Sequence, residues 1–131
     1  MIRHLFLLSL LLFTSFTPLN TWAEERLLKT LSEEREEKWR THILLIDKIV
    51  ECESSGRHTN IWGDTHTRHP AYGIAQFQRR TFYWLADKSG LEGLKWKRES
   101  DQIQLLSWAV ANGYGSLWTC YRKQMRGEWK R

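Results

Sequence analysis

The stretch LLIDKIVECESSGRH, residues 44–58, decides the fold of this chain. At about 100° per residue on a helix, Ile46, Ile49 and Glu53 fall on one face. Glu53 therefore ends a stripe that we expect to be buried, where its carboxyl group has little access to water. The polar run 54–56, with its glycine, then predicts the end of the helix.

A carboxyl group in such a position has a definite chemistry. Desolvation disfavours its charged form and raises its pKa. An acid that stays protonated near neutral pH can donate its proton to a leaving oxygen, which is the general-acid half of glycoside cleavage. Most glutamates at helix ends are caps or surface groups, so the position of Glu53 alone leaves both interpretations open.

Residues 1–23, MIRHLFLLSLLLFTSFTPLNTWA, are typical of a secretory signal peptide. Arg3 and His4 form the polar head, an apolar run follows, and Ala23 is the small residue expected at a cleavage site. The alternative is a membrane anchor, but a membrane span needs about 20 apolar residues and this run is shorter. We therefore expect a secreted or periplasmic protein, with no stable membrane insertion after cleavage.

Composition narrows the class of partner. Removal of residues 1–23 leaves 131 − 23 = 108 residues, the size of one domain, which we expect to be monomeric. The formal net charge of +5 becomes +4 without Arg3. A basic surface outside the cell favours an anionic envelope polymer, and export argues against nucleic acid. The eight tryptophans exceed the usual need of a small core, so some are expected to line a groove.

The chain has two cysteines, Cys52 and Cys120. In an oxidising compartment, an even pair in a small domain predicts a disulfide. The bond would close a loop of 120 − 52 = 68 intervals. Chain-entropy arguments give such a loop a stabilisation of at most about 4 kcal/mol. The bond would also join the end of the domain to Cys52, the residue that precedes Glu53.

The pattern predicts an α+β, mostly helical domain over residues 41–131, preceded by a charged helical lead-in over 24–40. Polar residues, Gly63 and Pro70 predict a small hairpin or irregular loop over 57–72. The other expected elements are a helix over 78–90 that stops near Gly90, and a helix that Asp101 and Gln104 open as a capping-box pair and Asn112 closes.

The polar loop also raises the alternative of a metal protein. His58, Asp64, His66 and His69 lie close together in sequence. A zinc site needs three or four converging ligands with orienting partners, and nothing in the sequence fixes that convergence. We therefore expect solvated loop histidines, with no metal and no cofactor.

Three segments together resemble the lysozyme-like superfamily of peptidoglycan glycosidases, in the same order and at similar spacings. They are CESSG at 52–56, AYGIAQFQRRTF at 71–82 and DQIQLLSWAVANGYGSLWTC at 101–120. The Glu-Ser pair is similar to that of soluble lytic transglycosylases, and the ending GSLWTC resembles that of resuscitation-promoting factor domains. The resemblance covers residues 44–121. It implies a lysozyme-like fold with a cleft, and cleavage of the β-1,4 bond between MurNAc and GlcNAc in peptidoglycan strands.

The resemblance also implies a role for each matched residue. Glu53 is expected to be the catalytic acid and base. Gln76 is expected to hold a sugar with its amide, and Thr81 to hydrogen-bond near the cleavage point. Tyr72 and Trp62 would flank the groove and stack on sugar faces. The alternatives are ordinary turn and helix-cap bonding for Gln76 and Thr81, and simple packing for the two aromatic residues.

Two departures from the family pattern affect the mechanism. VANGYG, residues 110–115, stands where many lytic transglycosylases have Ala-Tyr-Asn-Ala-Gly, so Tyr114 either replaces that tyrosine or packs. A retaining pair of carboxylates should stand about 5 Å apart and an inverting pair about 6.5 to 9.5 Å. Asp64 is the only candidate partner, and an Asx turn beside Gly63 is the plainer interpretation of it.

A lone acid is what a lytic transglycosylase needs. In that family the glutamate protonates the glycosidic oxygen, then helps the muramic acid 6-hydroxyl attack its own anomeric carbon, giving a 1,6-anhydro product. We therefore expect a lytic transglycosylase with Glu53 as general acid and base. The alternatives are a hydrolytic muramidase and a peptidoglycan-binding module without catalysis, which would have no need of Glu53.

Overall fold

The structure of the chain is a computed structural model that describes residues 21–59 and 70–128. Most of the expected signal peptide lies outside these residues. So do Trp62 and Asp64, two of the residues to which the sequence analysis gave a candidate role.

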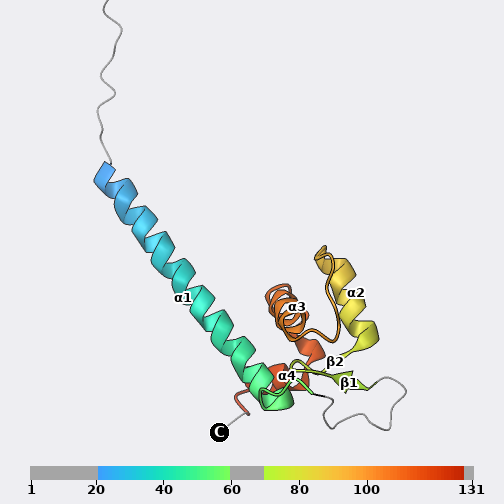
Figure 1. Cartoon of the computed structure of the whole chain (residues 1–131). Coiled ribbons are helices and arrows are strands. Elements are labelled where there is room, and N and C mark those ends of the chain that lie inside the picture. Colours follow the sequence, from blue (N-terminus) through green and yellow to red (C-terminus); the bar gives the residue numbers. More distant parts are fainter. Residues whose placement is uncertain (1–20, 60–69, 129–131) are drawn as a thin grey trace, which may run out of the picture. The chain divides into compact units, whose positions relative to one another are not determined.

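The described residues are mostly helical, with one small antiparallel sheet, as the sequence predicted (Figure 1). The chain divides into two compact units, residues 1–35 and residues 36–131. The elements in chain order are α1 (Thr21–Ser54), β1 (Ala71–Tyr72), β2 (Phe77–Gln78), α2 (Arg79–Ser89), α3 (Glu99–Ala111), the 3-10 helix η1 (Gly115–Leu117) and α4 (Thr119–Met125).

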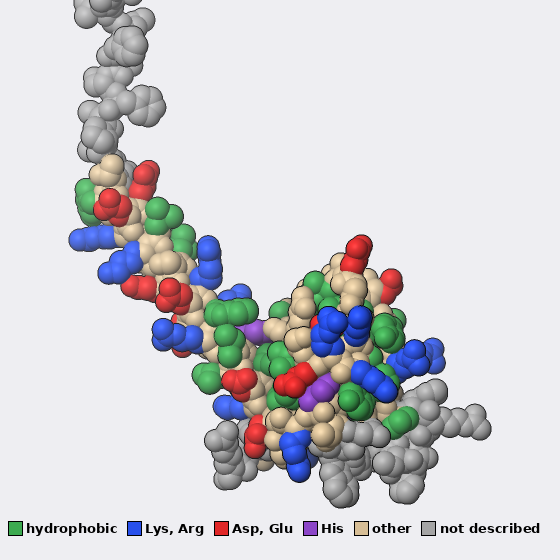
Figure 2. Space-filling model, in the orientation of Figure 1, with side chains coloured by type: hydrophobic (Ala, Val, Ile, Leu, Met, Phe, Trp, Pro, Cys, Tyr) green, Lys and Arg blue, Asp and Glu red, His purple; other side chains and the backbone are tan. Residues whose placement is uncertain are grey.

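The helix α1 contains both the charged lead-in and the helix predicted from Thr41, as one continuous element. Its sequence has no glycine or proline, so nothing interrupts the helical hydrogen bonds. Over residues 24–40 its side chains are exposed, and charges of both signs alternate along it (Figure 2). One of the pairs is Lys29 with Glu33 at 4.0 Å, an exposed contact that contributes little.

The buried face of α1 and its end agree with the sequence pattern. Ile46 and Ile49 are buried, and Glu53 is half-buried further along the same face. The helix ends at Ser54, because Ser55 and Gly56 both adopt left-handed backbone conformations, with φ of 52° and 68°. Glu53 is thus held in the last turn, next to the point where the chain leaves the helix.

The two short strands form a hairpin in the register Ala71 to Gln78 and Tyr72 to Phe77. A hairpin was expected within the loop 57–72. β1 lies at the end of that loop, and β2 lies beyond it. The turn between the strands, residues 73–76, begins at Gly73 with φ of 84°. A glycine suits this position because a positive φ strains a residue that has a Cβ atom.

The core lies where the hairpin meets α2 and α3, which pack against each other (Figure 1). Phe77 is its centre, with ring centroids 5.2 Å from Phe82 and 5.0 Å from Trp118, both edge to face. The largest fully buried side chains are Phe77, Phe82, Ile49, Leu85, Leu105, Leu106 and Gln102. Trp96 closes the core from the loop before α3, and its indole N–H donates to the Phe77 carbonyl oxygen at 2.8 Å.

The predicted start of the third helix was wrong. α3 begins at Glu99, two residues before Asp101, and its N-cap Arg98 makes no side-chain cap. Asp101 instead accepts a hydrogen bond from the backbone N–H of Lys95 at 2.7 Å, and its buried carboxylate lies 3.5 Å from the Arg98 guanidinium. The carboxylate stabilises the preceding loop, which local spacing could not reveal.

The predicted disulfide joins Cys52 to Cys120, with the Cα atoms 5.9 Å apart. It connects the last turn of α1 to the first turn of α4, so both ends of the domain meet beside Glu53. Within the described ranges, no helix combines the length and the apolar character that a membrane span requires.

Gly73→Ala should destabilise the domain more than Gly90→Ala. Both glycines have a positive φ, 84° and 67°, so each substitution carries a similar backbone strain. A Cβ at Gly73 would lie 2.5 Å from the Gln102 amide, whereas one at Gly90 would meet nothing within 4 Å. We expect the loss in unfolding free energy at Gly73 to exceed that at Gly90 by about 1–3 kcal/mol in urea denaturation. Equal losses would mean that Gln102 moves aside freely.

Candidate active site

The three segments that carry the family resemblance meet at the turn 73–76. From the end of α1, the Ser54 hydroxyl donates to the Ile74 carbonyl oxygen at 2.7 Å. From the start of α4, the buried Trp118 indole N–H donates to the Ala75 carbonyl oxygen at 2.8 Å. The Glu-Ser pair, the hairpin and the Trp-x-Cys segment are therefore held together by direct contacts.

Gln102 fastens the same turn from α3. Its side-chain oxygen accepts from the Ala75 N–H at 3.1 Å, and its amide nitrogen donates to the carbonyl oxygens of Tyr72 at 2.9 Å and Trp96 at 2.7 Å. The residue is fully buried, at 0% exposure. This role was not predicted, although the sequence holds a signal for it: Gln102, Leu105 and Ala109 share one helix face, and a polar group on a buried face needs partners.

Glu53 lies beside the start of α4. Its Oε1 accepts a hydrogen bond from the backbone N–H of Cys120 at 3.2 Å. Burial raises the pKa of Glu53 above its ordinary value, while the Cys120 N–H and then the positive charges of Lys123 and Arg122 pull it part of the way back. The group is thus an acid with a raised pKa whose ionised form is still supported by one donor and two cations.

Gln76 and Thr81 lie on either side of β2. Gln76 has a left-handed backbone, with φ of 49°, and its amide nitrogen donates to the Gly73 carbonyl oxygen at 2.7 Å. Its amide therefore closes its own turn, which was the alternative to sugar binding. Thr81 is half-buried in the first turn of α2.

The two described aromatic candidates lie in different surroundings. Tyr72 packs in the hairpin region, with ring centroids 5.3 Å from both His58 and Trp96. Tyr114 stacks on Trp108 of α3 at 5.7 Å and meets Trp84 of α2 edge to face at 5.6 Å. The structure thus gives Tyr114 the packing contacts that were the alternative to substrate binding.

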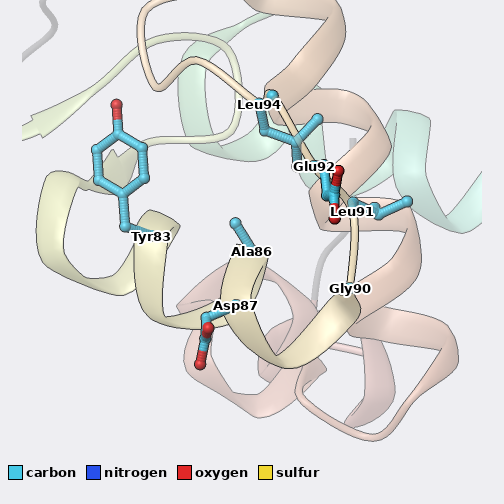
Figure 3. A pocket seen from close by; sticks show the side chains of 8 residues that line it. Tyr83, Ala86, Asp87, Gly90, Leu91, Glu92 and Leu94 are labelled. Carbon is cyan, nitrogen blue, oxygen red and sulfur yellow. The ribbon is translucent and has the colours of Figure 1, made fainter.

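Neither of two hollows in the described surface includes Glu53. One, of about 360 Å³, lies against α2 and the loop after it, and Figure 3 shows the residues that line it on α2, such as Tyr83 and Ala86, and on the loop, such as Leu91 and Leu94. The other, of about 230 Å³, lies between the domain part of α1 and α4, and is lined by Thr41, Leu44, Leu45, Lys48, Gln124 and Met125. Neither hollow is the cleft that the resemblance implies.

The described residues contain no group of three or more His, Cys, Asp or Glu side chains placed to hold a metal ion. Of the four residues in the metal alternative, His58 is described, and its ring nitrogens bond to the backbone groups of Ile74 and Lys97. Asp64, His66 and His69 lie outside the described part of the chain.

No protein-family model, curated protein or solved structure matches the chain.

Glu53→Gln should become more stable relative to the parent as pH rises. A glutamate with a raised folded pKa binds more protons folded than unfolded, so it costs stability as pH rises from the unfolded pKa of about 4.3 to the folded value, and that cost persists above it. A neutral amide removes the cost and can still accept from Cys120. Thermal unfolding followed by circular dichroism from about pH 4 to 7 should show the difference in Tm growing in favour of the variant.

The matched control is Glu51→Gln, on the exposed side of the same helix turn. Its Tm relative to the parent should vary less over this pH range. If the parent instead gained stability over Glu53→Gln as pH rose, the raised pKa of Glu53 would be wrong.

Proposed function

We propose that the protein is a secreted peptidoglycan-cleaving glycosidase, a lytic transglycosylase that acts on the MurNAc-GlcNAc β-1,4 bond with Glu53 as general acid and base. One observation carries the proposal. A half-buried carboxyl group with a raised pKa stands where the three resembling segments come into contact, next to the hydrogen bonds of Ser54 and Trp118 to the turn.

The surroundings of Glu53 suit both halves of such a reaction. Burial favours the protonated acid, which can donate its proton to the glycosidic oxygen as the C–O bond breaks. The carboxylate left behind is then stabilised by the Cys120 N–H, Lys123 and Arg122. As a base it takes the proton of the muramic acid 6-hydroxyl while that oxygen bonds to the anomeric carbon, which closes the 1,6-anhydro ring and restores the acid.

The remaining properties of the chain fit an enzyme of the cell envelope. A signal peptide over residues 1–23 and the Cys52–Cys120 disulfide both suit an oxidising compartment outside the cytoplasm. The net charge of +4 after removal of residues 1–23 favours anionic glycan strands as the partner. The chemistry needs no cofactor, because proton transfer and an internal nucleophile suffice.

A hydrolytic muramidase is the second candidate for the same site. Hydrolysis with retention or inversion would call for a second carboxylate at about 5 Å or 6.5 to 9.5 Å from Glu53. The sequence offers Asp64 for that role, and Asp64 lies outside the described residues. The third candidate, a module that binds strands without cutting them, is less favoured because it has no use for a half-buried acid with a raised pKa.

Glu53→Gln should strongly reduce turnover while leaving the fold and strand binding intact. The variant keeps the shape and the hydrogen bond to Cys120 but has no proton to transfer. General-acid catalysis is typically worth 10² to 10⁴-fold, so release of soluble fragments from purified sacculi should fall by at least about 100-fold. Cosedimentation with sacculi should be unchanged. Cutting at the parental rate would show that Glu53 is not the acid.

Products released from sacculi by the parent should carry 1,6-anhydro ends. Mass spectrometry separates them from hydrolysed ends, because each anhydro product is lighter by one water.

Asp64→Asn provides a second test, since a lytic transglycosylase should retain its activity and a two-carboxylate muramidase should lose about 100-fold or more. Hydrolysed ends would establish the muramidase, and strand binding without any product would establish the binding module.

A further inference from the structure

His58 joins three parts of the domain through its imidazole ring. It follows the end of α1, and its Nδ1 accepts the backbone N–H of Ile74 in the turn at 3.0 Å. Its Nε2 lies 3.0 Å from the carbonyl oxygen of Lys97 in the loop before α3. The ring of His58 and that of Tyr72 in β1 pack edge to face, with their centroids 5.3 Å apart.

The two backbone partners fix the protonation state of the ring. A backbone N–H can only donate, so Nδ1 must present a lone pair to Ile74. A carbonyl oxygen can only accept, so Nε2 must carry a hydrogen for Lys97. The ring is therefore neutral, with its proton on Nε2, and a second proton on Nδ1 would remove the acceptor that Ile74 needs.

Ile74 connects this histidine to the candidate active site. Its N–H bonds to His58, and its carbonyl oxygen accepts from Ser54, the residue after Glu53. The next backbone N–H in the direction of β1, that of Gly73, donates to Thr59, the residue after His58, at 3.2 Å. The segment 58–59 thus holds one side of the turn against the end of α1.

We propose that His58, in its neutral form with the proton on Nε2, is a positioning residue that holds the turn 73–76 against the end of α1 beside Glu53, and that protonation of its Nδ1 releases the turn and lowers activity in acid. The activity readout rests on the proposed function. The protonation state of His58 and the exchange of the Ile74 amide do not depend on that function, so failure of either proposal can be recognised separately.

The charged and titratable groups around His58 belong to three places. Among the described residues, the Tyr72 ring contacts it from β1, Lys97 contacts it through its backbone carbonyl oxygen, and Arg57 precedes it in the chain. None of these is a carboxylate that could compensate a positive imidazolium. Asp64, Arg68, His66 and His69 follow in the segment outside the described residues.

Nitrogen NMR of the uniformly labelled parent tests the structural part directly. At about pH 7.5, His58 should show an unprotonated Nδ1 and a protonated Nε2, with the signals assigned by their loss in His58→Asn. As pH falls and Nδ1 takes up a proton, the Ile74 amide loses its acceptor. Its hydrogen-exchange protection factor, the ratio of the intrinsic to the observed exchange rate, should then drop by about tenfold or more. A hydrogen on Nδ1 at neutral pH, or unchanged Ile74 protection once the ring is protonated, would overturn the proposal.

Variants test the link to activity on sacculi. His58→Asn retains an acceptor near the Nδ1 position and cannot be protonated, so it should keep Ile74 protected and lose the decline of kcat in acid. His58→Phe has neither polar atom, so Ile74 protection and kcat should fall together, by about tenfold, at every pH. If His58→Asn kept the parental decline in acid, or if His58→Phe cut sacculi at the parental rate, the positioning role would be wrong.

His42→Phe is the matched control. Its Nε2 lies 2.8 Å from the Ser107 hydroxyl, a partner that can donate or accept, so no protonation state is imposed there. This variant should leave Ile74 protection and the shape of the pH profile unchanged. A matching effect from His42→Phe would reduce the role of His58 to general stability. A parent that releases no product would refute the proposed function, while the NMR measurements would still decide the state of His58.

Discussion

Residues 73–75 of the turn 73–76 are buried, so their backbone polar groups must find partners inside the protein. The fold meets this requirement with side chains from separate segments: Ser54, His58, Gln102 and Trp118 each bond to it. An unpaired buried amide or carbonyl costs about as much as a lost hydrogen bond, so these side chains are not interchangeable with apolar ones. The turn therefore sets where α1, α3 and α4 lie within the domain.

The same requirement explains why an acid can be kept beside the turn. Glu53 precedes Ser54, which is bound to the turn, and it accepts from Cys120, which is covalently joined to Cys52. The hydrogen bond from Cys120 therefore places its carboxyl group beside the start of α4. Desolvation favours the protonated carboxyl group, whereas the Cys120 N–H and the positive charges of Lys123 and Arg122 favour the ionised carboxylate. An environment with both influences suits a group that must give up a proton and take one back.

Much of the fold followed from local patterns. Spacing predicted the buried stripe that ends at Glu53. The glycines predicted the ends of α1 and α2, near Gly56 and Gly90, and the oxidising compartment predicted the pairing of the two cysteines. The side-chain contacts of the turn did not follow, because they join residues 16 to 43 positions apart and depend on tertiary packing. Asp101 shows the difference, since its sequence neighbours suggested a helix cap and its true partner is the backbone of the preceding loop.

The spread of these partners along the chain has a consequence for how the protein folds. The first side chain that binds the turn is Ser54 and the last is Trp118, so no shorter stretch of the chain can satisfy the turn. Contacts between distant residues form slowly, because the loops between them must close first. Folding of the domain should therefore be a late and cooperative event, which is completed only after the chain has been synthesised as far as Trp118. Until then, the segment that carries Glu53 remains open to chaperones and proteases.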